Sequence, residues 1–87
     1  MAWKIVFTSL SEKDSKKIQK AKLDAKVSYL LDILSKNPYV NYPPYEKLKG
    51  ALNGYYSRRI NIQHRLIYKV YEEERTIQII RMWTNYE

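Results

Sequence analysis

One carboxylate lies among many cationic side chains in the middle of this sequence. Between Tyr45 and Lys69 the only acidic residue is Glu46. The same stretch holds six basic residues, which are Lys47, Lys49, Arg58, Arg59, Arg65 and Lys69. Clustered cations attract polyanions, and contacts from Lys and Arg to phosphates supply most nucleic-acid affinity. We therefore expect this stretch to attract polyanions such as nucleic acids. The plainer alternative is that its arginines are solvated strand residues that only keep the protein soluble.

These residue types suit cleavage of RNA through the ribose 2′-hydroxyl. That reaction needs a base for the hydroxyl proton, cations for the charge that grows on the phosphate, and an acid for the leaving 5′-oxygen. Glu46, which the surrounding positive charge should keep ionised, could be the base. Arg65, Arg59 and Lys49 could surround the phosphate. The reaction needs no metal, and a chain with no cysteine and one histidine offers no metal-binding cluster, so we expect no cofactor.

The general acid is the group that this pattern lacks. The only histidine, His64, falls on the opposite strand face from Arg65, which favours a structural role over a catalytic one. The nine tyrosines and two tryptophans exceed what a small core needs, and such rings stack on single-stranded bases. We expect Trp3 and Tyr29 in the core. Three other rings could belong to the core or to an RNA surface: Tyr56, Trp83 and Tyr86.

The elements that must position these residues indicate one α+β domain that covers residues 1–87. A chain of 87 residues, 45% of them hydrophobic, is enough for a single core. The expected order is an N-terminal strand over residues 2–8, a helical pair over residues 10–36, and a three-stranded antiparallel meander, with the helices on one sheet face. Whether residues 10–36 form one bent helix or two is left open by the sequence.

Capping and apolar spacing define the two helical segments. Ser9 and Glu12 have the spacing of a capping box. The first helix is mostly polar, and its expected buried contacts are Leu10, Ile18 and Ala21. In the second segment a broad apolar stripe predicts a buried helical face, and its members are Leu23, Val27, Leu30, Leu31 and Leu34.

The second half of the chain reads as a proline-rich loop followed by strands. Residues 37–46 contain all three prolines, which favours a loop or an extended edge segment. Asn53 and Gly54 form a turn signal before a strand over residues 55–62. Strands over residues 64–71 and 76–83 follow. No stretch has the length of a signal peptide core or a membrane-spanning helix, so a cytoplasmic protein is expected. No segment suggests a helix-turn-helix, which argues against a DNA-binding regulator.

Two segments make the chain recognisable. EKLKGALNGYYSRRINIQHRLIYKV followed by IIRMWTNYE resembles the YoeB/Txe branch of the RelE superfamily of bacterial toxins. The resemblance covers essentially the whole chain, and its second half is specific. It implies a compact, microbial-ribonuclease-like RelE fold and a toxin of a type II toxin–antitoxin system. Such a toxin binds the ribosomal A site and cleaves mRNA there as an endoribonuclease. The implied partners are a cognate antitoxin, the ribosome with its mRNA, and a second copy of the chain in a homodimer.

The resemblance also implies roles for individual residues. Glu46 matches the general base of the family and Arg65 its transition-state arginine. Lys49 and Arg59 match contacts to the phosphate and substrate. Two further cations would face ribosomal RNA or the substrate backbone, and these are Arg58 and Lys47. The aromatic residue that helps to position a base would be Tyr86.

Two positions depart from the pattern of these toxins. Gln63 stands where several relatives have an acid, which removes a carboxylate that could orient Arg65. Asn85 lies in WTNYE, where relatives read WTHYE, and the histidine there is the general acid of the family. An amide donates a hydrogen bond but delivers no titrating proton near pH 7. The chain should therefore cleave slowly or not at all. Either Asn85 was introduced to remove toxicity, or it is natural and leaves a weak enzyme or a non-catalytic ribosome-binding module.

Overall fold

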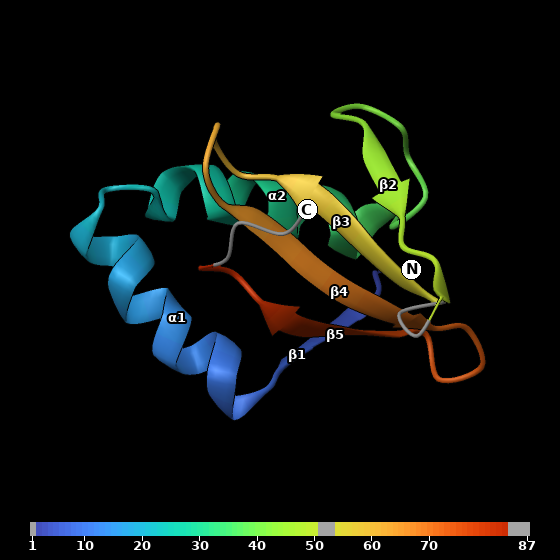
Figure 1. The fold of residues 1–87 in the computed structure, drawn as a ribbon. Helices are drawn as coiled ribbons and strands as arrows, with labels where there is room; N and C mark the ends of the chain where they lie inside the picture. The colour runs from blue at the N-terminus through green and yellow to red at the C-terminus, as the bar shows by residue number, and fades with distance from the viewer. Residues whose placement is uncertain (1, 51–53, 84–87) are drawn as a thin grey trace.

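The computed structural model describes residues 2–50 and 54–83 as an α+β structure, as expected (Figure 1). Its elements are β1 (Lys4–Phe7), α1 (Ser9–Lys20), α2 (Asp24–Lys36), β2 (Tyr45–Lys47), β3 (Tyr55–Arg59), β4 (Arg65–Tyr71) and β5 (Thr76–Arg81). The expected meander is present as β3, β4 and β5, and the sheet extends beyond it at both sides. Its strand order is β1-β5-β4-β3-β2, with β1 parallel to β5 and the other pairs antiparallel.

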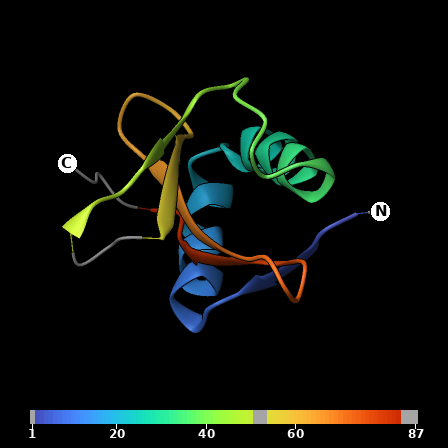
Figure 2. The same cartoon turned by 90° about the vertical axis from the view of Figure 1, so that its right-hand side faces the viewer.

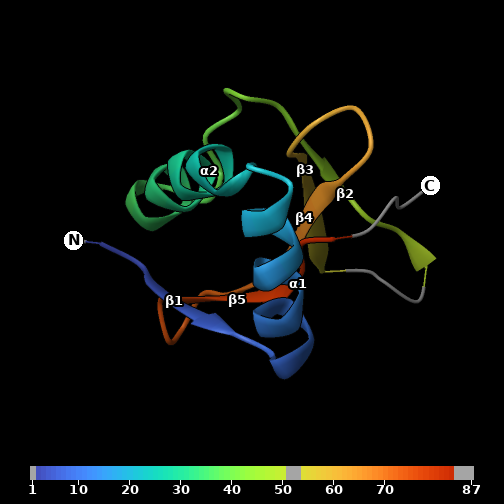
Figure 3. The ribbon, with the colours of Figure 1, turned by 90° about the vertical axis from the view of Figure 1, so that its left-hand side faces the viewer.

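Both helices share one apolar core with the sheet. Ile18 of α1 and Leu30 of α2 belong to the same buried cluster as Leu66, Tyr68 and Ile79 of the central strands. Figures 2 and 3 view the molecule from opposite directions and show a strongly twisted sheet with the helices against one face. The other face of β3 and β4 is thereby left for the site.

The helical region consists of two helices. The chain turns between them at Lys22, which has a φ of 60°, in the left-handed region. The capping prediction was wrong by one residue, because Thr8 is the N-cap of α1 and its hydroxyl accepts from the Ser11 amide at 3.1 Å. Of the three buried contacts expected in the first helix, only Ile18 is buried. Leu10, with half of its surface exposed, and Ala21 face outward.

The apolar stripe of the second segment and the core aromatic residues were partly predicted. Val27, Leu30 and Leu34 are buried, and Leu23 and Leu31 pack against the core from its rim. Trp3 is buried, as expected. Tyr29 is 52% exposed, so its expected place in the core was wrong. It lies on α2 beside the stripe rather than within it.

A buried arginine holds the proline-rich loop against the sheet. Arg58 has no exposed surface. Its guanidinium donates to the Tyr68 hydroxyl at 3.0 Å and to the carbonyls of Pro38, Val40 and Pro43 at 3.1, 2.6 and 2.5 Å. These donors satisfy loop carbonyls that would otherwise be costly to bury. The loop leads directly into β2, so Arg58 also fixes where β2 begins.

A buried carboxylate joins α1 to the end of β5. The Asp14 side chain is 3% exposed and forms an ion pair with Arg81, with Oδ2 2.8 Å from Nε. The same oxygen accepts from the backbone amides of Met82 and Trp83 at 3.0 and 3.3 Å. Burial by itself would raise the pKa of Asp14, but the hydrogen bonds from Arg81 and the two amides outweigh it and hold the pKa below the usual value of an aspartate.

We expect Asp14→Asn to lower the free energy of unfolding by about 2–3 kcal/mol at pH 7, because it leaves the Arg81 end of the pair without its counter-charge. Since the pKa of Asp14 is lowered in the folded state, its contribution is fully present above about pH 4 and is lost as the pH falls through the lowered value. Urea unfolding at pH 7 and pH 3 measures both effects. The control is Asp32→Asn, which breaks the exposed pair with Lys36 and should cost below about 1 kcal/mol. Equal losses in the two variants would contradict this account.

Within the described ranges, no helix has both the length and the apolar character needed to cross a membrane.

Candidate active site

Strand register brings two of the predicted catalytic residues, Glu46 and Arg65, onto one face of the sheet. Glu46 of β2 is paired with Ser57 of β3, and Arg59 at the end of β3 is paired with Arg65 at the start of β4. Arg58, between Ser57 and Arg59, faces the core, so its two neighbours face the other side. Local alternation and pairing therefore gather Glu46, Ser57, Arg59 and Arg65 on the sheet face away from the core.

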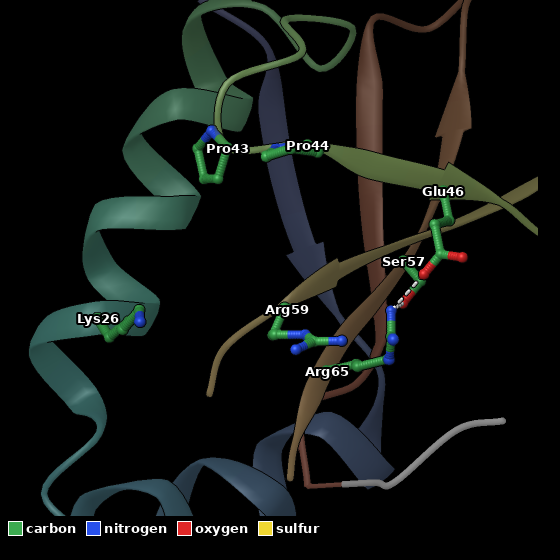
Figure 4. Close-up of a pocket in the computed structure, with 7 residues that line it drawn as sticks. All are labelled: Lys26, Pro43, Pro44, Glu46, Ser57, Arg59 and Arg65. Atoms are coloured by element: carbon green, nitrogen blue, oxygen red, sulfur yellow. Dashed lines mark hydrogen bonds and ion pairs between the residues drawn. The ribbon is translucent and has the colours of Figure 1, made fainter. Parts of the chain in front are cut away.

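These side chains line a cleft of about 470 Å³ (Figure 4). Its lining residues are Lys26, Pro43, Pro44, Glu46, Ser57, Arg59 and Arg65. The two prolines come from the loop that Arg58 holds, and they form the wall where β2 begins. The cleft thus combines one carboxylate with three cations from three different elements.

Glu46 and Arg65 are in direct contact. Arg65 Nη1 lies 2.5 Å from Glu46 Oε1 and 3.4 Å from Ser57 Oγ. The Arg65 side chain is 22% exposed and that of Glu46 is 66% exposed, so the guanidinium is largely covered while the carboxylate reaches into solvent. Because the Glu46 carboxylate of this pair is exposed, solvent screens the attraction, and ion pairs screened in this way contribute roughly 0–1 kcal/mol. An incoming phosphate could therefore take the Arg65 donors at little cost.

The remaining cations occupy different places. Arg59 is exposed at the cleft, and it has no hydrogen bond or ion pair with another described residue. Lys47 is exposed but pairs with Tyr56, so it faces the opposite side of the sheet from Glu46. Lys49 is exposed beyond the end of β2 and does not line the cleft. Lys69 lies over the rings of Tyr55 and Tyr71.

Arg58 is not where the sequence reasoning placed it. We expected it to face RNA, but its side chain is fully buried and its donors are engaged by Tyr68 and loop carbonyls. The physical reason is its register opposite Leu66, a core residue of β4. Burial raises the pKa of the Tyr68 phenol to about 12, although Arg58 acts in the opposite direction. The phenol thus stays protonated and accepts the Arg58 bond as a neutral group.

His64 and Trp83 form a stacked pair at the end of the sheet. Their ring centroids are 3.8 Å apart at an interplanar angle of 21°. His64 is 6% exposed, and its Nδ1 has no hydrogen-bond partner among the described residues. This burial agrees with the structural role that strand alternation predicted. Tyr56 stacks on Tyr68 at 5.6 Å, which makes it part of the half-buried aromatic layer and not a free RNA platform.

Comparison with known proteins decides the family. Residues 7–86 match the family model described as a YoeB-like toxin of bacterial type II toxin–antitoxin systems. The chain belongs to the YoeB-like toxins.

Individual relatives agree with this family assignment. Toxin YoeB of Synechocystis is 37% identical over 73 residues, which cover 82% of this chain and 85% of the relative. The YoeB/ParE toxin from Agrobacterium tumefaciens has a TM-score of 0.87 at 30% identity, over 95% of this chain and 99% of that one. The toxin in a heterotetrameric YoeB–YefM toxin–antitoxin complex from Staphylococcus aureus has a TM-score of 0.78 at 35% identity, over 97% and 98% of the two chains. The YoeB/RelE fold expected from the resemblance is confirmed.

Sequence reasoning missed one charged residue of the cleft in this YoeB-like chain, Lys26, and three uncharged lining residues, which are Pro43, Pro44 and Ser57. Lys26 belongs to α2, far in sequence from the basic stretch, and only the packing of α2 beside the sheet brings it to the cleft. The predicted sites Asn85 and Tyr86 lie outside the described residues. Among residues 2–50 and 54–83, no group of His, Asp and Glu side chains is arranged to hold a metal ion.

Proposed function

We propose that this YoeB-like toxin is an endoribonuclease that cleaves mRNA in the ribosomal A site, and that Asn85, in the place of the general acid, impairs the cleavage. The observation that carries the proposal is the contact between Glu46 and Arg65 in a cleft open to solvent. One group of this pair can accept a proton and the other can stabilise a phosphate. Glu46 and Arg65 are far apart in the sequence, so the strand register is what brings them into contact. The same register also places Arg59 at the cleft.

The geometry supports a simple sequence of bond changes. The Glu46 carboxylate takes the proton of a ribose 2′-hydroxyl, and the oxygen attacks the neighbouring phosphorus. Arg65 turns from Glu46 to the scissile phosphate and donates to its oxygens where negative charge grows. The bond to the 5′-oxygen breaks and the leaving oxygen takes its proton from water, which leaves a 2′,3′-cyclic phosphate and a 5′-hydroxyl. Asn85 stands at the acid position and supplies no titrating proton.

The proposed protein partner is a cognate antitoxin. One support is the description of the family, whose members are toxins of bacterial type II toxin–antitoxin systems. The other is the similarity to the toxin of the Staphylococcus aureus complex. An excess of positive charge, formally +7, would favour an acidic antitoxin segment as well as RNA.

A second candidate function is a ribosome-binding or RNA-binding module of the same fold that performs no chemistry. The sequence observation that favours it is Asn85 in the place of the general acid. Both candidates predict binding that weakens steeply with salt. They differ only in whether a reaction follows.

Asn85→His tests the proposal directly. If the rest of the site is intact, a histidine at position 85 should raise the rate of ribosome-dependent mRNA cleavage by about 10²- to 10⁴-fold, the usual contribution of a general acid. The measurement is primer extension on mRNA bound to ribosomes, with and without the variant. Asn85→Gln is the matched control, because it changes the side chain but adds no titrating group. No gain from the histidine would favour the non-catalytic module.

A further inference from the structure

The cleft carries more positive charge than its carboxylate can balance. Glu46 is paired with Arg65. Arg59 and Lys26 also line the cleft, and neither has a hydrogen bond or ion pair with any residue in the described part of the chain. Within residues 2–50 and 54–83, these two cations therefore face the same space without an anionic partner. Clustered like charges are unfavourable unless an anion joins them, so this arrangement points to a ligand with negative charge.

Lys26 differs from an ordinary solvated lysine by what surrounds it on its own helix. The helical residues three and four places after it are Tyr29 and Leu30, and the residue three places before it is the N-cap Leu23, so none of these neighbours is acidic. By contrast, Lys36 at the end of the same helix forms an ion pair with Asp32, with Nζ 3.2 Å from Oδ2. Lys36 of α2 is thus paired with an acid one turn away, whereas Lys26 at the cleft has no acidic neighbour at that spacing.

The three cations of the cleft belong to different walls. Arg65 is engaged at the end formed by Glu46 and Ser57. Arg59 lies directly across from Arg65 on the neighbouring strand, and Lys26 comes from α2, beyond Arg59 (Figure 4). A volume of about 470 Å³ is in the range of pockets that enclose whole small molecules and exceeds what one phosphate needs. The cleft therefore has room for a further part of an RNA strand on the Lys26 side of the scissile phosphate.

We propose that Lys26 and Arg59 form a second phosphate subsite, which holds the phosphodiester adjacent to the scissile one in single-stranded RNA. The inference rests on the proposed function, because it takes RNA as the occupant of the cleft. Arg59 presents its planar fork to the phosphate oxygens, and Lys26 adds a compact charge from the opposite wall. Two cations for one phosphate make this subsite a binding element. Proton transfer and stabilisation of the scissile phosphate remain the roles of Glu46 and Arg65.

The subsite predicts that Lys26 contributes only when the ligand has more than one phosphodiester. Two 2′-O-methyl oligonucleotides, which cannot be cleaved, serve as probes: a dinucleotide with one internal phosphodiester and a tetranucleotide with three. Binding is measured by NMR titration at several salt concentrations. Lys26→Gln should weaken tetranucleotide binding by roughly tenfold at low salt and reduce the slope of log K against log salt by about 0.7, the value for one lost contact to a single strand. Dinucleotide binding should change by less than about twofold if its single phosphodiester occupies the Arg65 end.

Lys20→Gln is the matched control, since it removes the same charge from an exposed residue of α1 that does not line the cleft. It should change the affinities for both probes slightly and to the same extent. The proposal is overturned if Lys26→Gln and Lys20→Gln have equal effects, if Lys26→Gln weakens both probes equally, or if neither probe binds. Because these probes report binding alone, length-dependent loss in Lys26→Gln would support the subsite even if Asn85→His showed no cleavage.

Discussion

Glu46→Gln, introduced into the Asn85→His chain, is expected to lower the rate of mRNA cleavage by about 10²- to 10⁴-fold and to leave ribosome binding nearly unchanged. Glutamine keeps the size of the side chain and an oxygen that can accept from Arg65, but it cannot take the proton of the 2′-hydroxyl. Glu46 is 66% exposed, so its loss should hardly affect the fold. Cleavage and binding are measured on the same ribosome–mRNA complexes.

The matched control is Glu73→Gln, which removes the same charge from an exposed residue after β4. It should cleave at the rate of the Asn85→His parent. If Glu46→Gln cleaved as fast as this control, the base would have to be another group. If Glu46→Gln lost ribosome binding together with cleavage, the carboxylate would act in recognition, and its proposed role as the base beside Arg65 would be wrong.

Arg58→Met is the second variant with a large expected effect, and it acts on stability. The variant should lose about 3–5 kcal/mol of unfolding free energy, because methionine cannot donate the hydrogen bonds that Arg58 makes to the Tyr68 hydroxyl and to three loop carbonyls. That is a large share of the roughly 5–15 kcal/mol that stabilises a small domain. Urea unfolding followed by circular dichroism measures the loss.

The next residue offers a control with the same chemistry. Arg59→Met exchanges the same side chains on the opposite face of β3, where Arg59 is exposed and has no partner among the described residues. It should change the unfolding free energy by less than about 0.5 kcal/mol. Similar losses in the two variants would show that the Arg58 hydrogen bonds contribute little to stability.

The two adjacent arginines show what the sequence could and could not predict. Strand alternation requires Arg58 and Arg59 to face opposite sides, so one of the two had to point toward the core. The resemblance implied that both contact RNA, Arg59 at the substrate and Arg58 at ribosomal RNA or the substrate backbone. Only the pairing of Arg58 with Leu66 decides which one is buried, and that register depends on contacts between strands.

Other features of the fold and of the site were predicted where they depend on local sequence and were missed where they depend on distant segments. The apolar stripe of α2 and the burial of His64 depend on local periodicity, and both were predicted. Lys26 and the place of β1 in the sheet depend on segments far apart in the chain, and the sequence carries no local sign of either. The contact between Glu46 and Arg65 was expected from their chemistry, and the sheet brings it about through two successive strand pairings.

The parallel pairing of β1 with β5 has a consequence for the order of folding. Lys4 pairs with Thr76 and Phe7 with Ile79, so among the described strands the first along the chain has its sheet neighbour in the last. During synthesis β1 must wait unpaired while β2, β3 and β4 can already form hairpins. We therefore expect the nascent chain to expose the apolar surface that β1 and β5 later cover, and to complete its core only after nearly all of the chain has emerged.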